Sequence, residues 1–141
     1  MGLSHLDHYN IEVVDLDETV KFYCELLGLK QGFRPPIARP GAWLYAENGH
    51  PSIHLLADAD KSKASTGCLH HICFAATGKE GIRARLTDAG IPFNVVVLPR
   101  VNNTQFFMQD PNGINVELNF PPEETTPEDV AIMERQRGKT P

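Results

Sequence analysis

The chain has 141 residues, of which 41% are hydrophobic and 22% charged, values typical of a water-soluble globular protein with a core of its own. The net charge is -5 at pH 7 and no basic stripe is present, which excludes nucleic acid and anionic membrane surfaces as expected partners. No apolar run approaches the roughly 20 residues of a membrane-spanning helix, so we expect no membrane segment.

The first half of the chain predicts a strand, a helix and three further strands. Alternating apolar residues indicate the first strand over 6–14. Asp15, followed three residues later by Glu18, resembles a capping box, and the helix that follows ends at Gly28. These elements make one βαβββ module. The three further strands are predicted over 29–33, 42–46 and 52–57.

The same order of elements returns in the second half. A linker at 58–67 without hydrophobic periodicity separates a first module at 1–57 from a second module at 68–120. The tail at 121–141 is polar, with a possible helix from Pro127 to about Arg135, and we interpret it as a frayed end rather than a clip onto a partner subunit. The second module has a helix over 79–88 and strands over 68–76, 92–98, 104–109 and 114–120.

Cysteine usage and the first residues indicate a reducing compartment. Cys24, Cys68 and Cys73 show no CxxC spacing and are odd in number, which does not suit a disulfide framework. The N-terminal residues lack the basic and apolar regions of a signal peptide. We therefore expect a cytoplasmic protein.

A constant offset of 63 positions relates the two modules and needs no gap. It pairs His8 with His71, and His54 with Glu117. An internal repeat indicates one supersecondary unit copied twice. The same offset gives four further matches, which are Trp43 with Phe106, Leu44 with Phe107, Leu55 with Leu118 and Pro36 with Pro99.

Strand periodicity places the four matched polar residues on comparable surfaces. Successive side chains of a strand point to opposite faces of the sheet. In each strand the neighbouring apolar residues belong against the helix, so His8, His54, His71 and Glu117 point away from it. Pairing of the two modules can bring these faces around one cavity.

Imidazole and carboxylate groups are donors from which divalent metal sites are built. The four matched residues, His8, His54, His71 and Glu117, therefore predict a metal site. The remaining histidines break the facing pattern or lie near turns, and we expect them to be exposed or to support the ligands. They are His5, His50 and His70.

Four sequence motifs carry a resemblance to a known family. The first strand and helix read LDHYNIEVVDLDETVKFYCELLGL, and the end of the second module reads FFMQDPNGINVELNF. Between them, GAWLYAENGHPSIHLL and LHHICFAA fill the expected places. Over about residues 4–120 the chain resembles the vicinal oxygen chelate superfamily, which includes glyoxalase I, methylmalonyl-CoA epimerase, extradiol dioxygenases and fosfomycin-resistance proteins. The resemblance implies an α+β glyoxalase/dioxygenase-like fold, in which two tandem βαβββ modules form a curved, barrel-like mixed sheet.

The resemblance also implies the chemistry of the site. Family members bind a substrate with two adjacent oxygens to a divalent ion, here Ni, Co, Zn, Mn or Fe, while a nearby carboxylate or imidazole moves a proton. Glyoxalase I usually has a glutamate where this chain has His54. Glu117 is then the carboxylate ligand or the base, and His54 is a second base or a further ligand, so both are catalytic candidates.

We favour a glyoxalase-like metalloenzyme that performs isomerisation or lyase chemistry on a small-molecule substrate. Two alternatives stay open. His8, His71 and Glu117 form the two-histidine, one-carboxylate set of a single-domain Fe(II) extradiol-type dioxygenase. Bleomycin-resistance proteins instead use the fold to sequester a ligand without metal. Since the family commonly dimerises, we expect a homodimer, with the site inside one chain or across two.

Other residues near the expected cavity have two interpretations each. Trp43, Phe106 and Phe107 are either apolar walls of the cavity or parts of the core. Three loop arginines either bind an anionic substrate or are solvated, and we favour solvation for each. They are Arg34, Arg39 and Arg100.

Overall fold

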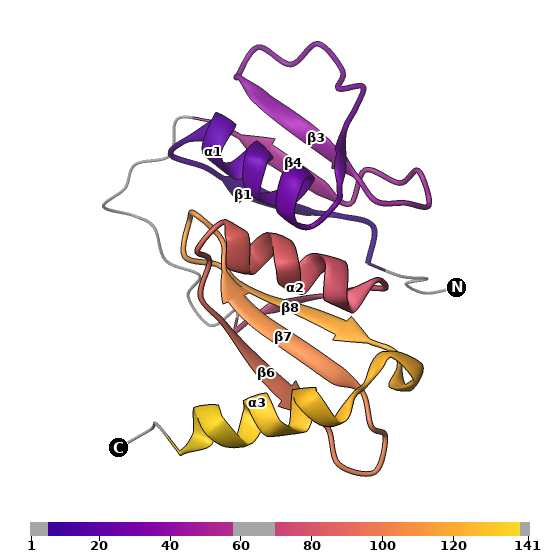
Figure 1. The fold of residues 1–141 in the computed structure, drawn as a ribbon. Coiled ribbons are helices and arrows are strands. Elements are labelled where there is room, and N and C mark those ends of the chain that lie inside the picture. Colours follow the sequence, from indigo (N-terminus) through magenta and orange to yellow (C-terminus); the bar gives the residue numbers. More distant parts are fainter. Residues whose placement is uncertain (1–5, 58–69, 139–141) are drawn as a thin grey trace. The chain divides into compact units, whose positions relative to one another are not determined.

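The computed structural model describes residues 6–57 and 70–138, which belong to two compact units, each a βαβββ module (Figure 1). The predicted α+β fold of two such modules is confirmed. The first unit contains β1 (Tyr9–Glu12), α1 (Leu16–Lys21), the π-helical turn η1 (Phe22–Leu26), β2 (Lys30–Gln31), β3 (Gly41–Tyr45) and β4 (Ile53–Leu56). The second contains β5 (Ile72–Ala75), α2 (Lys79–Asp88), β6 (Phe93–Val97), β7 (Thr104–Gln109), β8 (Asn115–Phe120), the 3-10 turn η3 (Pro122–Glu124) and α3 (Pro127–Arg137). The predicted strand residues Cys68 and Leu69 lie outside the described part.

The first unit is a four-stranded mixed sheet in the order β1-β4-β3-β2, with β1 parallel to β4 and the other pairs antiparallel. Its core is built by alternate apolar residues such as Ile11, Leu44 and Leu55, which are buried. α1 begins as predicted, because the Asp15 side chain accepts a hydrogen bond from the Glu18 N–H at 2.9 Å. The alternation therefore places Trp43 of β3 and His54 of β4 on the opposite sheet face.

The helical segment of the first unit changes pitch before it ends at Gly28. η1 buries two consecutive residues, Phe22 and Tyr23, which a regular 3.6-residue period would send to different directions. Gly28 has a φ of +88°, a conformation that favours glycine and ends the helix where the sequence predicts. The extent of the predicted helix is therefore correct, although its second half is π-helical.

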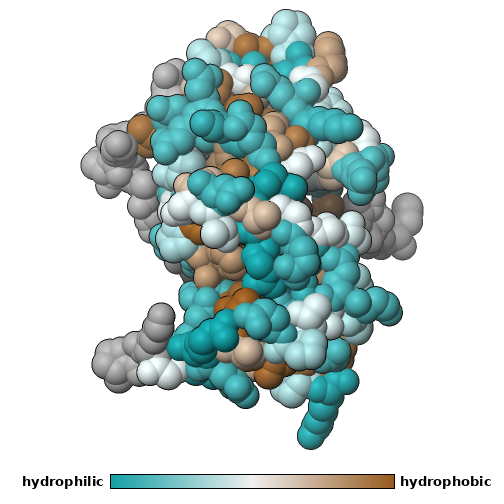
Figure 2. Space-filling model, in the orientation of Figure 1, coloured by the Kyte–Doolittle hydropathy of each residue, from teal (hydrophilic) through white to brown (hydrophobic). Residues whose placement is uncertain are grey.

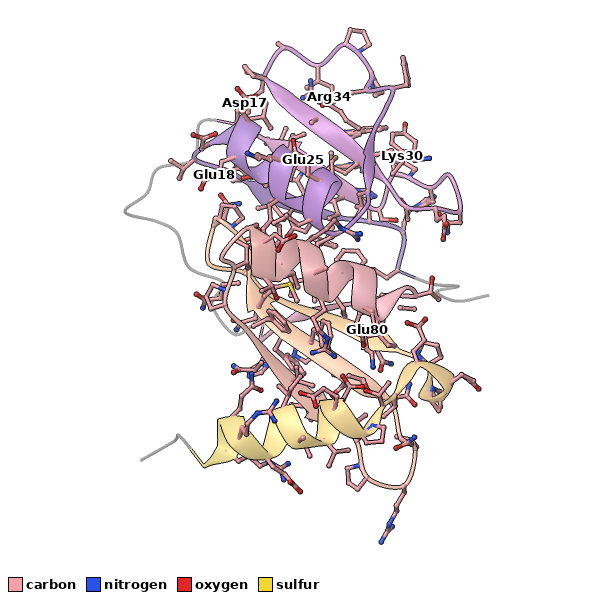
Figure 3. All side chains as sticks on the ribbon, viewed as in Figure 1. Asp17, Glu18, Glu25, Lys30, Arg34 and Glu80 are labelled. Carbon is pink, nitrogen blue, oxygen red and sulfur yellow. The ribbon has the colours of Figure 1, made fainter. Side chains whose placement is uncertain are left out.

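Two of the loop arginines fasten the loop that follows β2. Arg34 (labelled in Figure 3) donates to the Arg39 carbonyl at 2.7 Å, and Arg39 donates to the Ala57 carbonyl at 2.8 Å and to Glu12 Oε1 at 2.8 Å. Both guanidinium groups thus bind backbone carbonyl groups. The expectation that each arginine is only solvated is therefore wrong for Arg34 and Arg39. β2 is shorter than the predicted 29–33.

The second unit repeats the sheet in the order β5-β8-β7-β6, with β5 parallel to β8. α2 covers one face of this sheet, where Leu86, Phe106, Val116 and Leu118 are buried (Figure 1). Phe106 is therefore core and not a cavity wall. The opposite face carries the polar residues discussed below.

The constant offset of 63 correctly matches two strands of the first unit with their equivalents in the second unit, and it fails for a third strand. β1 Tyr9–Glu12 corresponds residue by residue to β5 Ile72–Ala75, and His54 corresponds to Glu117 through their parallel partners Asn10 and Cys73. Trp43, however, lies opposite His54 in the sheet, and Phe107 lies opposite Glu117. The predicted match of Trp43 with Phe106 is therefore wrong. The β7–β8 hairpin is one residue shorter than the β3–β4 hairpin, which makes Phe107 the equivalent of Trp43.

The tail is not a frayed end, because α3 packs along β6, the edge strand of its own unit (Figure 1). Gln136 Oε1 accepts the Val95 N–H at 2.8 Å, and the Gln136 amide donates to the Phe93 carbonyl at 3.2 Å. Asp129, fully buried, accepts hydrogen bonds from Lys79 and Arg83 of α2. The helix covers backbone groups that an open edge would expose.

The surface is mostly hydrophilic in the view of Figure 2, with hydrophobic residues in small separate areas. Within residues 6–57 and 70–138, no helix has the length and apolarity required to cross a bilayer.

Candidate functional site

The second unit brings His71 and Glu117 together on the polar face of its sheet. Glu117 lies in the middle of β8 opposite Cys73 of β5, and His71 immediately precedes β5. His71 Nε2 and Glu117 Oε2 are 3.0 Å apart, and the Glu117 side chain is only 8% exposed. The sequence prediction that these two residues share a face is consistent with this contact.

Gln105 of β7 holds the other carboxylate oxygen, since its Nε2 donates to Glu117 Oε1 at 2.5 Å. Both oxygens of the buried carboxylate therefore have a hydrogen-bond partner. Sequence reasoning missed Gln105. The available signal was its position two residues from Phe107 on the same strand face, which becomes informative only once the register of β7 against β8 is known.

The rest of this polar face is rich in side-chain amides. No lysine or arginine occurs in the described strands β5 to β8. The face therefore offers neutral donors and acceptors around Glu117, with the ring of Phe107 6.2 Å from that of His71. The amide contacts run from Asn103 to Asn119 at 3.3 Å, from Gln109 to Asn115 at 3.4 Å, and from Asn115 to the His70 carbonyl at 2.9 Å.

Cys73 of β5 places a thiol on this face. Loss of solvent around its sulfur and the neighbouring Glu117 carboxylate raise the pKa of the Cys73 thiol to about 11. The thiol is protonated at neutral pH, and it is a poor nucleophile in this state.

The first unit brings His8 and His54 together, in a stack with Trp43. The His54 ring lies parallel to the Trp43 ring, with centroids 3.9 Å apart and planes 2° apart. His8 stacks with His54 at 3.8 Å and 22°. A metal ion bonds an imidazole in the plane of the ring, along the nitrogen lone pair. Two nearly parallel stacked rings do not direct their lone pairs at a common point in this arrangement.

The free nitrogen of His54 can be identified from its contacts. His54 forms a hydrogen bond with the backbone of Pro51, and since proline has no N–H, the imidazole must be the donor. Nε2 is buried and has no partner within the described residues. Nδ1 therefore carries the proton in the neutral ring, which leaves the Nε2 lone pair available as a base or a ligand.

Asp7 contacts both His8 and His50. Asp7 Oδ2 lies 2.7 Å from His8 Nδ1, and its backbone carbonyl lies 2.7 Å from His50 Nε2. A carboxylate on one ring nitrogen fixes the orientation of the imidazole and leaves the other nitrogen, here Nε2, to bind a metal.

The stack predicts a fluorescence titration of the metal-free protein. Burial and the nearby His8 lower the pKa of His54 from its ordinary value of 6.5. Trp43 is the single tryptophan, and a protonated imidazole quenches an indole more strongly than a neutral one. We expect Trp43 emission to rise with pH through a midpoint below 6.5, and folding stability to fall as the pH drops below 6.5.

The control for this titration is the His54→Phe variant, which keeps an aromatic ring between His8 and Trp43. The emission change should be largely lost there. A wild-type midpoint at or above 6.5, or an unchanged transition in the variant, would contradict the assignment.

The spacing of the candidate donors can be compared with that around a divalent ion. Two donor atoms that each lie about 2.1 Å from one ion are about 3 Å apart, which matches the His71–Glu117 distance of 3.0 Å. The spacing of this pair therefore fits a metal. Among residues 6–57 and 70–138, no three histidine, cysteine or acidic residues gather in one metal-binding group. The four predicted residues are found as two pairs, one in each unit.

Comparison with known proteins decides the family. The family model of the Glyoxalase/Bleomycin resistance protein/Dioxygenase superfamily matches residues 5–118. The chain belongs to this superfamily. Its members commonly bind a divalent metal ion, so the fit of the His71–Glu117 pair has a precedent.

Several superfamily proteins are similar to this chain. "Glyoxylase I 4" of Arabidopsis thaliana is 28% identical over 132 residues, which cover 84% of this chain and 71% of that protein. A putative glyoxalase family protein from Bacillus anthracis has 18% identity, covers 86% of this chain and 98% of its own, and gives a TM-score of 0.67. Lactoylglutathione lyase from Agrobacterium tumefaciens has 19% identity, coverages of 89% and 100%, and a TM-score of 0.62. These two structures support the superfamily fold alone.

Proposed function

We propose that the chain is a divalent-metal-dependent enzyme that performs isomerisation or lyase chemistry on a small substrate with two adjacent oxygens. The observation that carries the proposal is the 3.0 Å contact between His71 Nε2 and the buried carboxylate of Glu117 on a superfamily fold. The similarity to the Arabidopsis protein favours glyoxalase-like chemistry.

Within the second unit, we propose His71 and Glu117 as metal ligands, through the Nε2 and Oε2 atoms that face each other. Within the first unit, His8 stays a predicted ligand through Nε2, because Asp7 holds its Nδ1. The bound ion would supply Lewis acidity to the two substrate oxygens. His54 was also predicted as a ligand, but its stacking on His8 favours another role.

His54 is proposed as the proton carrier. Its pKa is lowered by burial and by His8, so the ring is neutral at pH 7 and its unpartnered Nε2 can accept a proton. Trp43 and His8 hold the ring from both sides, which fixes its direction without using that nitrogen. The Glu117 carboxylate is instead occupied by Gln105 and His71, which favours binding over proton transfer.

The test combines metal content with a substrate panel. Protein purified without chelator should contain roughly one Ni, Co, Zn or Mn ion per chain by elemental analysis and should isomerise a hemithioacetal of methylglyoxal. His54→Phe should keep the metal and lose about 10²- to 10⁴-fold in kcat. His50→Phe, the matched control, removes a histidine of the same unit that we assign no proton transfer.

The outcomes separate the remaining alternatives. Oxygen-labile Fe with turnover of a catechol would favour an extradiol-type dioxygenase, a reading supported by the two-histidine, one-carboxylate set. Failure to bind any of these ions with all four residues intact would overturn both enzyme proposals and favour a ligand-sequestering protein. Loss of the metal in His54→Phe would restore His54 as a ligand.

A further inference from the structure

We propose that Gln105 is a positioning residue, which fixes Glu117 so that a single carboxylate oxygen, Oε2, is presented with His71 Nε2. The inference rests on the proposed metal-dependent function. It assigns a role to a residue of β7, a strand that contributes none of the four predicted site residues.

The sheet register explains how Gln105 reaches the carboxylate. Gln105 lies opposite Asn119, and Phe107 lies opposite Glu117, so the Gln105 side chain reaches diagonally across β7 and β8 on their polar face. Its Nε2 ends 2.5 Å from Glu117 Oε1. Both residues lie in regular strands, and a contact between strands is more rigid than a contact from a loop.

The hydrogen-bond partners of Glu117 show what Gln105 contributes. His71 Nε2 can donate to Oε2 only while it carries a proton, and it must lose that proton to bind a metal. The Gln105 amide on Oε1 and the protonated Cys73 thiol then remain as hydrogen-bond donors to this carboxylate. Without the Gln105 amide, Oε1 would lose the donor that comes from β7, and the carboxylate would be freer to rotate and to offer either oxygen.

Glutamine also suits the electrostatics of the position. Its amide is neutral, so it orients Glu117 without cancelling the negative charge that attracts a cation. An arginine or lysine would orient the carboxylate equally well but would compete with the metal for its charge. The absence of such residues from strands β5 to β8 is consistent with this role.

The experiment measures Co²⁺ binding to three glutamine variants of the full chain. Gln105→Met keeps the length of the side chain and removes the donor, and Gln105→Asn keeps an amide that is too short to reach Glu117. Gln109→Met is the matched control, because Gln109 lies on the same strand and face but contacts Asn115. The readouts are the dissociation constant by competition with a chromophoric chelator and the visible spectrum of bound Co²⁺.

Both Gln105 variants should bind Co²⁺ about 10- to 100-fold more weakly than the wild type and with an altered spectrum, while Gln109→Met keeps both properties. Wild-type affinity and spectrum in Gln105→Met and Gln105→Asn would overturn the inference and leave the proposed function intact. Circular dichroism of the metal-free variants establishes that each is folded. If wild-type protein binds no divalent ion, the proposed function itself fails, and the role of Gln105 fails with it.

Discussion

Replacing His71 by alanine is expected to abolish stoichiometric binding of Ni²⁺ or Co²⁺. The substitution removes the imidazole that lies 3.0 Å from Glu117 and leaves the carboxylate with Gln105 as its partner. A protein site that loses one of its donors binds a divalent ion far less tightly. Isothermal titration calorimetry on chelator-treated protein measures the effect, which we expect to exceed about 100-fold in dissociation constant.

The control for this prediction is His50→Ala. It removes a histidine of similar exposure, since the His50 and His71 side chains are 37% and 38% exposed, and its ring contacts Asp7 rather than a proposed ligand. This variant should bind metal close to the wild-type affinity. Stoichiometric metal retained in His71→Ala would refute the assigned site, whatever the activity of the variant.

Replacing Asp129 by alanine is expected to lower the free energy of unfolding more than any other substitution proposed for this protein. Asp129 is fully buried, and Lys79, one of its partners, is only 1% exposed. Removing one member of a buried ion pair costs about 3–5 kcal/mol. The buried Lys79 would be left with the exposed Glu80 carboxylate, 3.4 Å away, in place of its buried partner. Thr126 would lose its capping partner as well, because the Asp129 carboxylate accepts its N–H at 2.8 Å. Urea unfolding followed by circular dichroism measures the change.

Glu128→Ala on the same helix is the matched comparison. Glu128 pairs with Arg135 at 2.7 Å, but both side chains are exposed, at 66% and 60%. Such a surface pair contributes about 0–1 kcal/mol, so this variant should remain near the wild-type stability. Equal effects of the two substitutions would show that the tail does not contribute a buried ion pair to the second unit.

The stabilisation that Asp129 contributes also depends on pH. Burial acts to raise the pKa of this carboxyl, but the hydrogen bond from Lys79 and the bonds from Thr126 outweigh burial and lower it. A carboxyl with a lowered pKa stabilises the folded state above the pKa of the unfolded chain. That stability should be lost as the pH falls through the folded pKa, and the loss should be absent in Asp129→Ala.

Strand periodicity and the internal repeat were sufficient to predict much of the fold. Alternating apolar residues such as Ile11 and Val13 are buried in the first unit, as expected, because a strand in a one-sided sheet must place every second side chain in the core. The same alternation selected His71 and Glu117, which the structure places in contact. The helix-capping residues Asp15 and Gly28 could be predicted because capping depends on residues close in sequence.

Contacts that depend on the register between strands could not be predicted from the periodicity of the sequence. Trp43 was matched with Phe106 because a gapless offset ignores the shorter hairpin of the second unit. Gln105 was missed because its diagonal reach to Glu117 follows from that same register. The tail was interpreted as frayed because its anchor is made with residues of α2, about 50 positions earlier.

The sequence by itself determined that the chain is two copies of one βαβββ unit, and it predicted that His8, His54, His71 and Glu117 lie on the faces away from the helices. These properties follow from periodicity, a local consequence of strand geometry. Only the tertiary structure decided how the four residues are used within each unit: His54 stacked between Trp43 and His8, and Glu117 held between His71 and Gln105. The reason is physical, since ring stacking and hydrogen bonds depend on side-chain positions across strands, which strand pairing sets.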